Sequence, residues 1–261
     1  MFKRKQLEDG VAGYTRYLAA TAPRYFPEIR SDSIRVVLLR RVSRPESILH
    51  HYAVGDGTHS RRLIVKEVRP GNRQDSATAY ERPRLNVPAP AEDKARCEFD
   101  SLARIHDYFT RVGDDRFAAV RVLDHLRDRQ ALVMEAVEGS SLRRLLYRSV
   151  LPGVNNRGLI EGSMRNAGHW LRLYHSMPPG PSTMSRHTTR AEYIEFVAAA
   201  TEFLSKHRGE RQWFRSVRER LEDVSQDLPE YLPLCTGHGD FALRNVLVTP
   251  EGRIAVIDTR A

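Results

Sequence analysis

The pattern of apolar residues changes once along this 261-residue chain, after Glu138-Gly139, and this change restricts the fold more than any other feature. Before it, short runs rich in Val, Ile and Leu are bounded by turn residues, which is typical of strands. After it, apolar residues recur at the three- and four-residue spacing of amphipathic helices. The sequence therefore predicts an α+β protein in which a small strand-rich lobe precedes a mainly helical lobe.

The strand-rich part begins with an amphipathic helix over 4–20. Five strands are predicted after it, at 34–42, 47–54, 61–68, 117–123 and 131–137. A long proline-rich loop over 69–91 and a helix over 92–112 separate the third strand from the fourth. Gly55-Asp56-Gly57-Thr58 indicates a hairpin between the second and third strands.

The helix-rich part is predicted to contain helices over 140–149, 158–177, 191–206 and 212–224. Ser140 or Ser141 is the candidate N-cap of the first helix, because a serine oxygen accepts a hydrogen bond from an N–H of the first turn. Two short strands follow, at 245–248 and 253–257, joined by a Thr-Pro-Glu-Gly turn.

The residues that carry chemistry gather around this last hairpin. His238-Gly239-Asp240 is followed by Asn245 five residues after the aspartate, and Asp258 comes thirteen residues after Asn245. The H-x-D-x4-N spacing is that of a phosphoryl-transfer loop, in which the Asp meets the acceptor hydroxyl and the Asn meets a metal ion beside the phosphates. The hairpin returns the chain, so we expect Asp258 to face the same ion. Amide and carboxylate oxygens both suit Mg²⁺.

The segment 238–258, HGDFALRNVLVTPEGRIAVID, resembles the aminoglycoside phosphotransferase-like kinases, a branch of the protein-kinase-like fold that includes choline kinases. The resemblance implies a two-lobe protein-kinase-like fold with a small antiparallel-sheet N-lobe and a mainly helical C-lobe. By this match the nucleotide-binding N-lobe covers 1–133, the hinge covers 134–139 and the catalytic C-lobe covers 140–261.

The same resemblance implies ATP or GTP and Mg²⁺ as cofactors, Asp240 as the catalytic residue, and Asn245 and Asp258 as metal ligands. It also requires a strand lysine that holds the α- and β-phosphates and a helix glutamate that pairs with this lysine. Lys66 ends an apolar run on the third predicted strand and is one of only five lysines among 42 basic residues. Glu98 has the matching place on the next predicted helix.

The segment 132–139 resembles the hinge between the lobes of these kinases. By that match Met134 lies behind the adenine. The backbone C=O of Glu135 and the backbone N–H of Val137 would then hydrogen-bond the base, so both residues are candidate nucleotide contacts.

Two departures from the family pattern change the expectations. The loop 41–47 contains no glycine, although a phosphate-covering loop normally uses glycine for close backbone approach, so Ser43, Arg44 or Ser47 is the candidate phosphate contact. The chain also stops three residues after Asp258, where relatives continue with several helices. We therefore expect a C-terminally truncated, incomplete C-lobe that is marginally stable and associates through its uncovered helices.

Several of these residues have simpler explanations. Lys66 beside Glu67 can be an edge-strand pair that guards against aggregation. His238 is interpreted as a structural hydrogen-bonding residue of the loop, and Arg244 either stabilises phosphate charge or bridges to the catalytic aspartate. Three histidines of one predicted hairpin match no metal-ligand spacing: His50, His51 and His59.

The formal net charge of +9 makes nucleic acid a partner to consider. The charge is spread evenly, without a block of five or six like charges or a basic stripe interleaved with aromatics, so we expect no nucleic-acid partner. No stretch reaches the ~18 apolar residues of a membrane span, and the N-terminus lacks the apolar core of a signal peptide. Two cysteines cannot form a disulfide framework, so a reducing cytoplasm is expected.

The sequence is thus interpreted as an ATP- or GTP-dependent phosphotransferase that acts on a hydroxyl of a small molecule. The alternatives are a nucleotide-binding but catalytically impaired kinase-like fragment and a basic nucleic-acid-binding protein. Candidate acceptors are a sugar, an amino alcohol, a glycolipid precursor or an antibiotic. An aminoglycoside ranks below a neutral or anionic acceptor, because a polycation needs an acidic cleft and the C-terminal half has no acidic cluster beyond the metal site.

Overall fold

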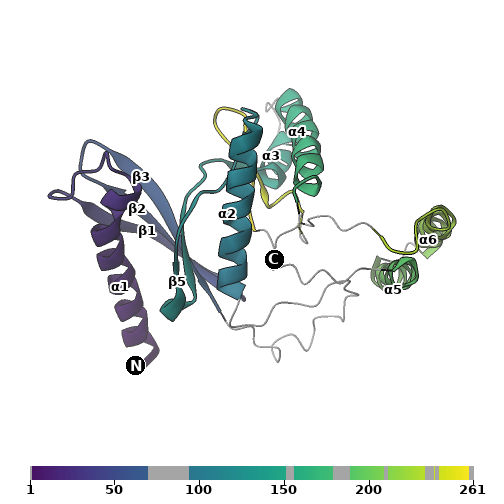
Figure 1. Ribbon diagram of the computed structural model, residues 1–261, viewed down its shortest axis with the longest axis horizontal. Coiled ribbons are helices and arrows are strands. Elements are labelled where there is room, and N and C mark those ends of the chain that lie inside the picture. Colours follow the sequence, from purple (N-terminus) through teal and green to yellow (C-terminus); the bar gives the residue numbers. More distant parts are fainter. Residues whose placement is uncertain are drawn as a thin grey trace. The chain divides into compact units, whose positions relative to one another are not determined.

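The computed structural model describes residues 2–69, 94–150, 156–178, 189–208, 211–232, 238 and 241–258. The chain divides into two compact units, one of Met1–Gly71, Pro90–His175 and Gly237–Ala261, the other of Asn72–Ala89 and Ser176–Thr236. The first unit contains the described strands and helices α1 to α4, and the second contains α5 and α6 (Figure 1). The fold is α+β, as the sequence predicts. The predicted loop 69–91 falls outside the described residues except for its first position.

Five strands form the first sheet in the order β1-β2-β3-β6-β5, and all neighbours are antiparallel. Their bounds are Arg35–Ser43 for β1, Ser47–Gly55 for β2, Ser60–Val68 for β3, Val122–Leu126 for β5 and Ala131–Glu135 for β6. Four predicted strands are thereby confirmed, with ends that shift by at most two residues. A short 3₁₀ turn, Arg127–Arg129, joins β5 to β6.

Helix α1, Phe2–Tyr25, covers one face of this sheet (Figure 1). The period-two alternation of β2 and β3 turns Tyr52, Leu63 and Val65 toward the helix, where they are fully buried together with Leu18. Removal of this apolar surface from water stabilises α1 on the sheet. The helix is longer than the predicted 4–20 because its last turns continue into the same apolar cluster, with Ala22 also buried.

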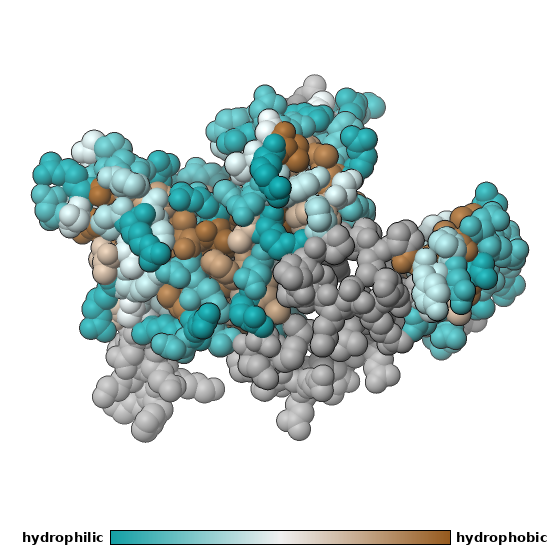
Figure 2. Space-filling view, viewed as in Figure 1, coloured by the Kyte–Doolittle hydropathy of each residue, from teal (hydrophilic) through white to brown (hydrophobic). Residues whose placement is uncertain are grey.

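Helix α2, Lys94–Val112, covers the opposite face of the sheet. Leu102 of α2 is buried with Leu132 of β6, and Ile64 of β3 packs against them. Lys66 pairs directly with Leu132 in the ladder between β3 and β6, so its side chain leaves the sheet on this same face. In Figure 2, apolar side chains gather over the strands that lie between α1 and α2, whereas α2 shows mainly hydrophilic side chains.

The predicted strand over 117–123 is wrong, because the chain changes sheets within it. Phe117–Ala118 forms β4, which pairs in parallel with β9, Ile254–Val256, and the first sheet takes up the chain only at Val122. Val120, between the two strands, is buried against the cluster beneath α2. An apolar run predicts burial, but it does not specify which of two sheets receives its backbone hydrogen bonds.

The second sheet has the order β4-β9-β8-β7, with β7 at Ser140–Ser141 and β8 at Val246–Val248. The hairpin between β8 and β9 turns at the predicted Thr-Pro-Glu-Gly segment. There the N–H of Gly252 donates to the carbonyl of Thr249 at 2.9 Å. Gly252 has a φ of +80°, a conformation that glycine adopts at little cost.

Helices α3, Leu142–Ser149, and α4, Arg157–His175, complete the first unit. Of the two candidate N-caps, Ser141 is the one used by α3: its hydroxyl oxygen accepts a hydrogen bond from the N–H of Arg144 at 3.3 Å. The predicted helix over 158–177 is present as α4 but ends at His175.

Helices α5, Arg190–Arg208, and α6, Arg211–Ser225, contact each other in the second unit and confirm the predicted helices there. The guanidinium of Arg190 donates to the carbonyls of Gln226 and Leu228 at 3.1 and 3.2 Å, which ties the start of α5 to the segment after α6. Within the part of the chain that is described, no helix has the length and apolar character needed to cross a membrane.

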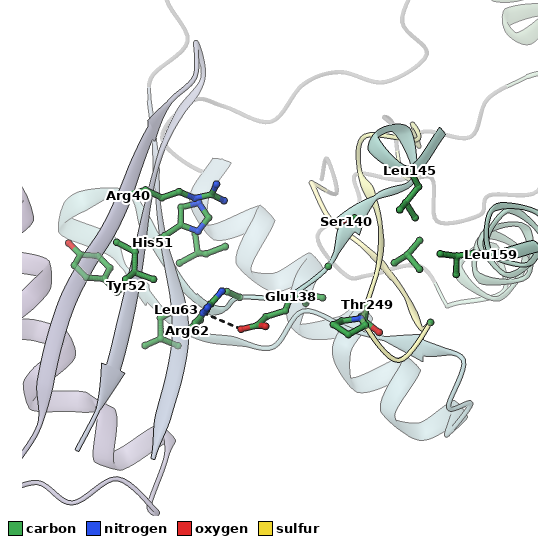
Figure 3. A pocket seen from close by; sticks show the side chains of 18 residues that line it. Arg40, His51, Tyr52, Arg62, Leu63, Glu138, Ser140, Leu145, Leu159 and Thr249 are labelled. Carbon is green, nitrogen blue, oxygen red and sulfur yellow. Dashed lines mark ion pairs between the residues drawn. The ribbon is translucent and has the colours of Figure 1, made fainter. Parts of the chain in front are cut away.

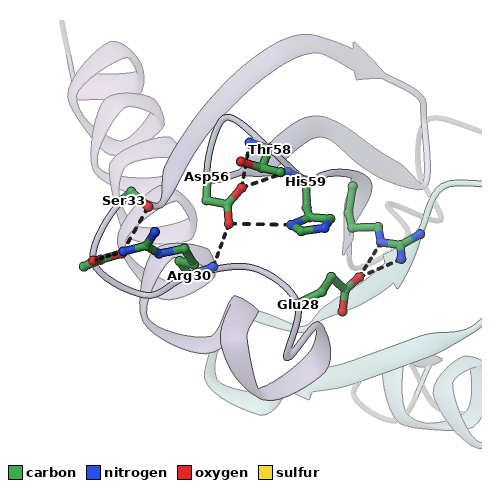
Figure 4. A network of polar contacts seen from close by, with 8 residues as sticks. Glu28, Arg30, Ser33, Asp56, Thr58 and His59 are labelled. Carbon is green, nitrogen blue, oxygen red and sulfur yellow. Dashed lines mark hydrogen bonds and ion pairs between the residues drawn. The ribbon is translucent and has the colours of Figure 1, made fainter.

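Asp56 organises the hairpin between β2 and β3 (Figure 4). Its carboxylate accepts hydrogen bonds from three backbone N–H groups, those of Arg30 at 2.9 Å and of Thr58 and His59 at 2.8 Å each. The N–H of Arg30, followed by those of His59 and Thr58, holds the pKa of Asp56 well below its usual range. The hairpin tip is thereby fastened to the loop between α1 and β1.

We predict that Asp56→Asn lowers the midpoint of thermal unfolding by several degrees near neutral pH, because an amide cannot accept all three hydrogen bonds. A carboxylate whose pKa is lowered by folding stabilises the fold above its unfolded pKa of about 3.9 and loses this effect as pH falls through the folded value. The gap between variant and wild type should therefore narrow below about pH 4. Thermal unfolding across this pH range measures the difference in unfolding temperature between variant and wild type, with the exposed Asp32→Asn as control. A difference that persists in acid contradicts the role given to the Asp56 carboxylate.

Candidate active site

Lys66, on β3, lies between two carboxylates. Its Nζ donates to Oε1 of Glu98 on α2 at 2.5 Å and to Oδ1 of Asp258, just after β9, at 3.1 Å. The side chains of Lys66 and Glu98 are each only 14% exposed, so solvent ions screen their interaction weakly. Three of the residues assigned to one site from the sequence thus lie together in the structure.

Burial and charge act in opposite directions on this cluster. Burial disfavours the ammonium of Lys66, but the carboxylates of Glu98 and Asp258 outweigh burial and raise the pKa of Lys66. Burial raises the pKa of Glu98, and Lys66 only partly offsets it. Lys66 therefore keeps its positive charge at physiological pH, as a ligand for phosphate oxygens must.

The hairpin between β8 and β9 places Asn245 and Asp258 at the same end. The N–H of Ile257 donates to the carbonyl of Asn245 at 2.9 Å, which fastens the residue before Asp258 to Asn245. Asn245 is buried, with 3% of its surface exposed. Asp258 has a φ of +62°, in the left-handed region that few residues other than glycine adopt. A strained backbone at a candidate metal ligand is typical of a functional site.

A second cation, Arg44, faces Asp258 from the loop between β1 and β2. Its Nη1 lies 3.7 Å from Oδ2 of Asp258, while Lys66 approaches the other carboxylate oxygen. Arg44 was one of three candidate phosphate contacts in the glycine-free loop. The structure brings this one to the cluster.

A pocket of about 760 Å³ lies between the first sheet, the predicted hinge segment and the turn between β8 and β9 (Figure 3). Ile64 and Val137 are among the residues that line it. Lys66, Glu98 and Asp258 do not line it, but Ile64 is two residues before Lys66 on the same face of β3. The pocket and the charged cluster are therefore neighbours along one strand.

The backbone of the predicted hinge is held by both neighbouring strands. The N–H of Glu135 donates to the carbonyl of Arg121 and that of Ala136 to the carbonyl of Arg62, each at 2.9 Å. Met134 is buried at 8% exposure, beneath α2. The hydrogen bonds expected between a base and the C=O of Glu135 or the N–H of Val137 stay predictions.

The decisive comparison is with families of known proteins. Residues 46–258 match the phosphotransferase enzyme family. The chain belongs to this family. The match runs from the end of the glycine-free loop to Asp258 and includes Lys66, Glu98 and Asn245, whereas α1 and β1 precede it. Together with the antiparallel sheet and the helices that follow, it supports the protein-kinase-like α+β fold class that the sequence predicts.

Among solved structures, the chain is similar to a Rio2 kinase from Chaetomium thermophilum, crystallised as an ADP/Mg²⁺-phosphoaspartate complex. The two are 14% identical with a TM-score of 0.36, and the match covers 95% of this chain and 53% of the other. The chain thus spans about half the length of that kinase. No match was found among curated proteins.

The expected catalytic residue, Asp240, lies outside the described residues, but positions on either side of it are placed. His238 is buried, and its ring meets Trp170 of α4 edge-on with 6.1 Å between ring centroids. Phe241 stacks on Trp170 at 6.0 Å, and Trp170 stacks in turn on Phe109 of α2 at 5.1 Å. Aromatic pairs at such distances stabilise one another, so both flanks of the predicted catalytic loop are anchored to Trp170 of α4.

The two candidate metal ligands fit Mg²⁺ rather than a metal that is bound by histidine. Asn245 and Asp258 offer an amide oxygen and a carboxylate, which are hard ligands suited to Mg²⁺. His50 and His51 are successive residues of a strand and therefore leave it on opposite faces. In the described ranges, no group of three or more His, Cys, Asp or Glu side chains is placed to hold a metal.

Sequence reasoning missed the arginines and the histidine that line the pocket. Arg40, His51 and Arg62 line it, and Arg62 forms an ion pair with Glu138 at 3.2 Å (Figure 3). Burial, reinforced by nearby arginines such as Arg40, lowers the pKa of His51 to about 4, so this imidazole is neutral at physiological pH. The period-two alternation that carries Lys66 to this face also carries Arg62 there, and this signal was present in the sequence.

Proposed function

We propose that this protein is a Mg²⁺-dependent kinase that transfers the γ-phosphoryl group of ATP or GTP to a hydroxyl of a small molecule. The observation that carries the proposal is the cluster of Lys66, Glu98 and Asp258, in which one ammonium lies 2.5 and 3.1 Å from two carboxylates. In this proposal 1–133 and 140–261 act as the two lobes, and 134–139 acts as the hinge between them.

Lys66 binds the α- and β-phosphates in this mechanism, and Glu98 orients it. A lysine side chain has four rotatable bonds, so its ammonium needs a fixed partner to meet a phosphate in one place. Glu98 supplies that partner from α2, and the short Nζ–Oε1 distance of 2.5 Å supports the role. The charge of Lys66 is then in place before the nucleotide binds, so no reorganisation is needed when charge develops during transfer.

Asn245 and Asp258 would hold Mg²⁺, and the bound ion would supply positive charge to offset the negative charge of the phosphates. Asp240 accepts a hydrogen bond from the acceptor hydroxyl and aims its oxygen in line with the γ-phosphorus. Because His238 and Phe241 are held by Trp170, the loop that carries Asp240 is fixed at both flanks.

The pocket beside the hinge is the proposed site for the base and ribose. Val137 and Ile64 supply apolar walls, and the hinge supplies backbone groups that can recognise a base edge. For the acceptor we favour a neutral or anionic alcohol, such as a sugar or a phospho-alcohol class of substrate, over a polycation. The net charge of +9 supports this preference, because a basic protein repels a polycation.

The proposal is tested by thermal unfolding of the whole chain with ATP, GTP or ADP, each with and without Mg²⁺. A ligand that binds only the folded state raises the unfolding temperature, so the Mg²⁺-nucleotide should raise it more than either component alone. Transfer of labelled phosphate is then measured against neutral, anionic and cationic alcohols. Absence of any nucleotide-dependent shift contradicts the proposal, and a shift without transfer to any alcohol favours the catalytically impaired alternative.

We predict that Lys66→Met weakens nucleotide binding by roughly tenfold or more, since a charged hydrogen bond is worth about 1.5–3 kcal/mol and the thioether has no charge to offer. Turnover should fall further than binding, because the ammonium acts most strongly on the charge of the transition state. Titration calorimetry and steady-state kinetics measure both effects. The exposed Lys206→Met is the matched control, and equal behaviour of the two variants contradicts the role of Lys66.

A further inference from the structure

We propose that Arg44 is a polyphosphate-binding residue of the nucleotide site, and that it reaches the phosphates by giving up the carboxylate of Asp258. This inference rests on the proposed function, since it assigns one more residue to the same site. It would make the loop between β1 and β2 a phosphate-binding loop that uses a side chain where a glycine-rich loop would use its backbone.

The first step concerns the position of Arg44. The N–H of Arg44 donates to the carbonyl of Ser47 at 2.8 Å, which closes a tight turn between β1 and β2. The next part of this loop is also fastened to β3, because the N–H of Arg69 donates to the carbonyl of Glu46 at 3.0 Å. The loop that carries Arg44 is therefore fastened by its own turn and, at Glu46, to the residue that follows β3.

The second step concerns what Arg44 contacts. Its Nη1 lies 3.7 Å from Oδ2 of Asp258, and Lys66 lies 3.1 Å from Oδ1. The two oxygens of one carboxylate thus face two cations from two different segments of the sheet. Mg²⁺ bound at Asp258 would compete directly with both cations, since like charges repel at these distances.

The third step is the exchange of partners. At 3.7 Å the contact of Arg44 with Asp258 is an ion pair outside hydrogen-bond geometry, and the Arg44 side chain is 49% exposed, so it contributes little stability and is easily broken. A guanidinium binds phosphate oxygens through two parallel N–H donors and does so more strongly than it binds a distant carboxylate. Phosphates would therefore draw Arg44 away from Asp258, which would leave this carboxylate available to hold Mg²⁺.

The fourth step is the chemistry of the loop itself. The segment 41–47 contains no glycine, and side chains with a Cβ hinder close approach of backbone N–H groups to phosphate. A long side chain with five fixed donors compensates for this, because it reaches the phosphates without bringing the backbone near them. Of the described residues in this loop, Arg44 is the one with an ion pair into the Lys66 cluster.

The test compares Arg44→Ala with wild type, using the whole chain and three probes: sodium tripolyphosphate without metal, adenosine, and Mn²⁺ alone as a substitute for Mg²⁺. The variant should bind tripolyphosphate roughly ten- to a hundredfold more weakly, which is the usual effect of a charged hydrogen bond. Adenosine affinity should not change. Mn²⁺ should bind more tightly, because one competing cation has left Asp258. A lower affinity for tripolyphosphate together with a higher affinity for Mn²⁺ cannot arise from general damage to the fold.

Arg41→Ala is the matched control, since Arg41 lies in the same glycine-free segment and its backbone partner in the β1–β2 ladder is His50 of β2. Arg44→Lys should recover part of the tripolyphosphate affinity, because it restores the charge without the fork of donors. If Arg44→Ala leaves tripolyphosphate affinity unchanged, or weakens adenosine by the same factor, the inference is overturned while nucleotide binding by wild type still supports the proposed function. A wild-type chain that binds neither ATP nor tripolyphosphate overturns both.

Discussion

Replacing Asp240 by Asn is expected to lower the rate of phosphoryl transfer by a factor on the order of 10³, the usual effect of losing a general base. The affinity for ATP should stay nearly unchanged, because Asp240 is assigned to the acceptor hydroxyl and not to the nucleotide. The amide oxygen of Asn can still accept a hydrogen bond but is too weak a base to take up the hydroxyl proton, so the reaction loses its proton acceptor.

The measurement is a pair of experiments on the same preparation: titration calorimetry with Mg²⁺-ATP and a transfer assay at saturating acceptor. Trp170 and its aromatic neighbours hold the flanks of the loop, so the substitution should not change the unfolding temperature by much. An Asp240→Asn variant that keeps more than a tenth of the wild-type rate would show that the carboxylate has another role. Equal loss of ATP affinity would place it among the nucleotide ligands instead.

Replacing Asp258 by Ala is expected to abolish most of the dependence of nucleotide binding on Mg²⁺. Removing groups that merely support a metal ligand costs about 10- to 100-fold in metal affinity, so removing the ligand itself should cost at least as much. In buffer without divalent cations we expect the opposite effect, so that the Asp258→Ala variant binds ATP more tightly than wild type. Without Asp258, Lys66 and Arg44 lose a competing anion and are both available to the phosphates.

Calorimetric titration with ATP, in Mg²⁺ and in chelator, measures both parts of this prediction. Glu251→Ala is the control, since Glu251 is an exposed carboxylate in the turn of the same hairpin. Equal weakening of ATP binding in Mg²⁺ and in chelator would mean that Asp258 supports the fold or the Lys66 cluster and does not hold the metal.

Much of this site was readable from the sequence because its signals are local. His238, Asp240, Asn245 and Asp258 lie within 21 residues, and the short hairpin between the last two returns the chain to its starting point. The strand pattern around Lys66 is similarly local, because a period of two assigns each side chain to a face of the sheet before the neighbours are known. Such features depend on backbone geometry over a few residues, and the sequence specifies that geometry directly.

Contacts between segments that are distant in the sequence could not be predicted from local patterns. Lys66 meets Glu98 from 32 residues away and Asp258 from 192 residues away, and no pattern within either segment encodes the distance between them. Their pairing came from a family resemblance, and the structure supplies its physical basis: α2 is buried on the face of the sheet that carries Lys66.

The sequence by itself thus determined the α+β fold class, most of the strands and helices, and the candidate residues of the phosphoryl-transfer loop. Only the tertiary structure decided that the run 117–123 divides between two sheets, that Arg40 and His51 line the pocket, and that Arg44 forms an ion pair with Asp258. The physical reason is the same in each case. Burial, charge neutralisation and hydrogen bonding between distant segments depend on which surfaces meet, and a one-dimensional pattern states only that each surface needs a partner.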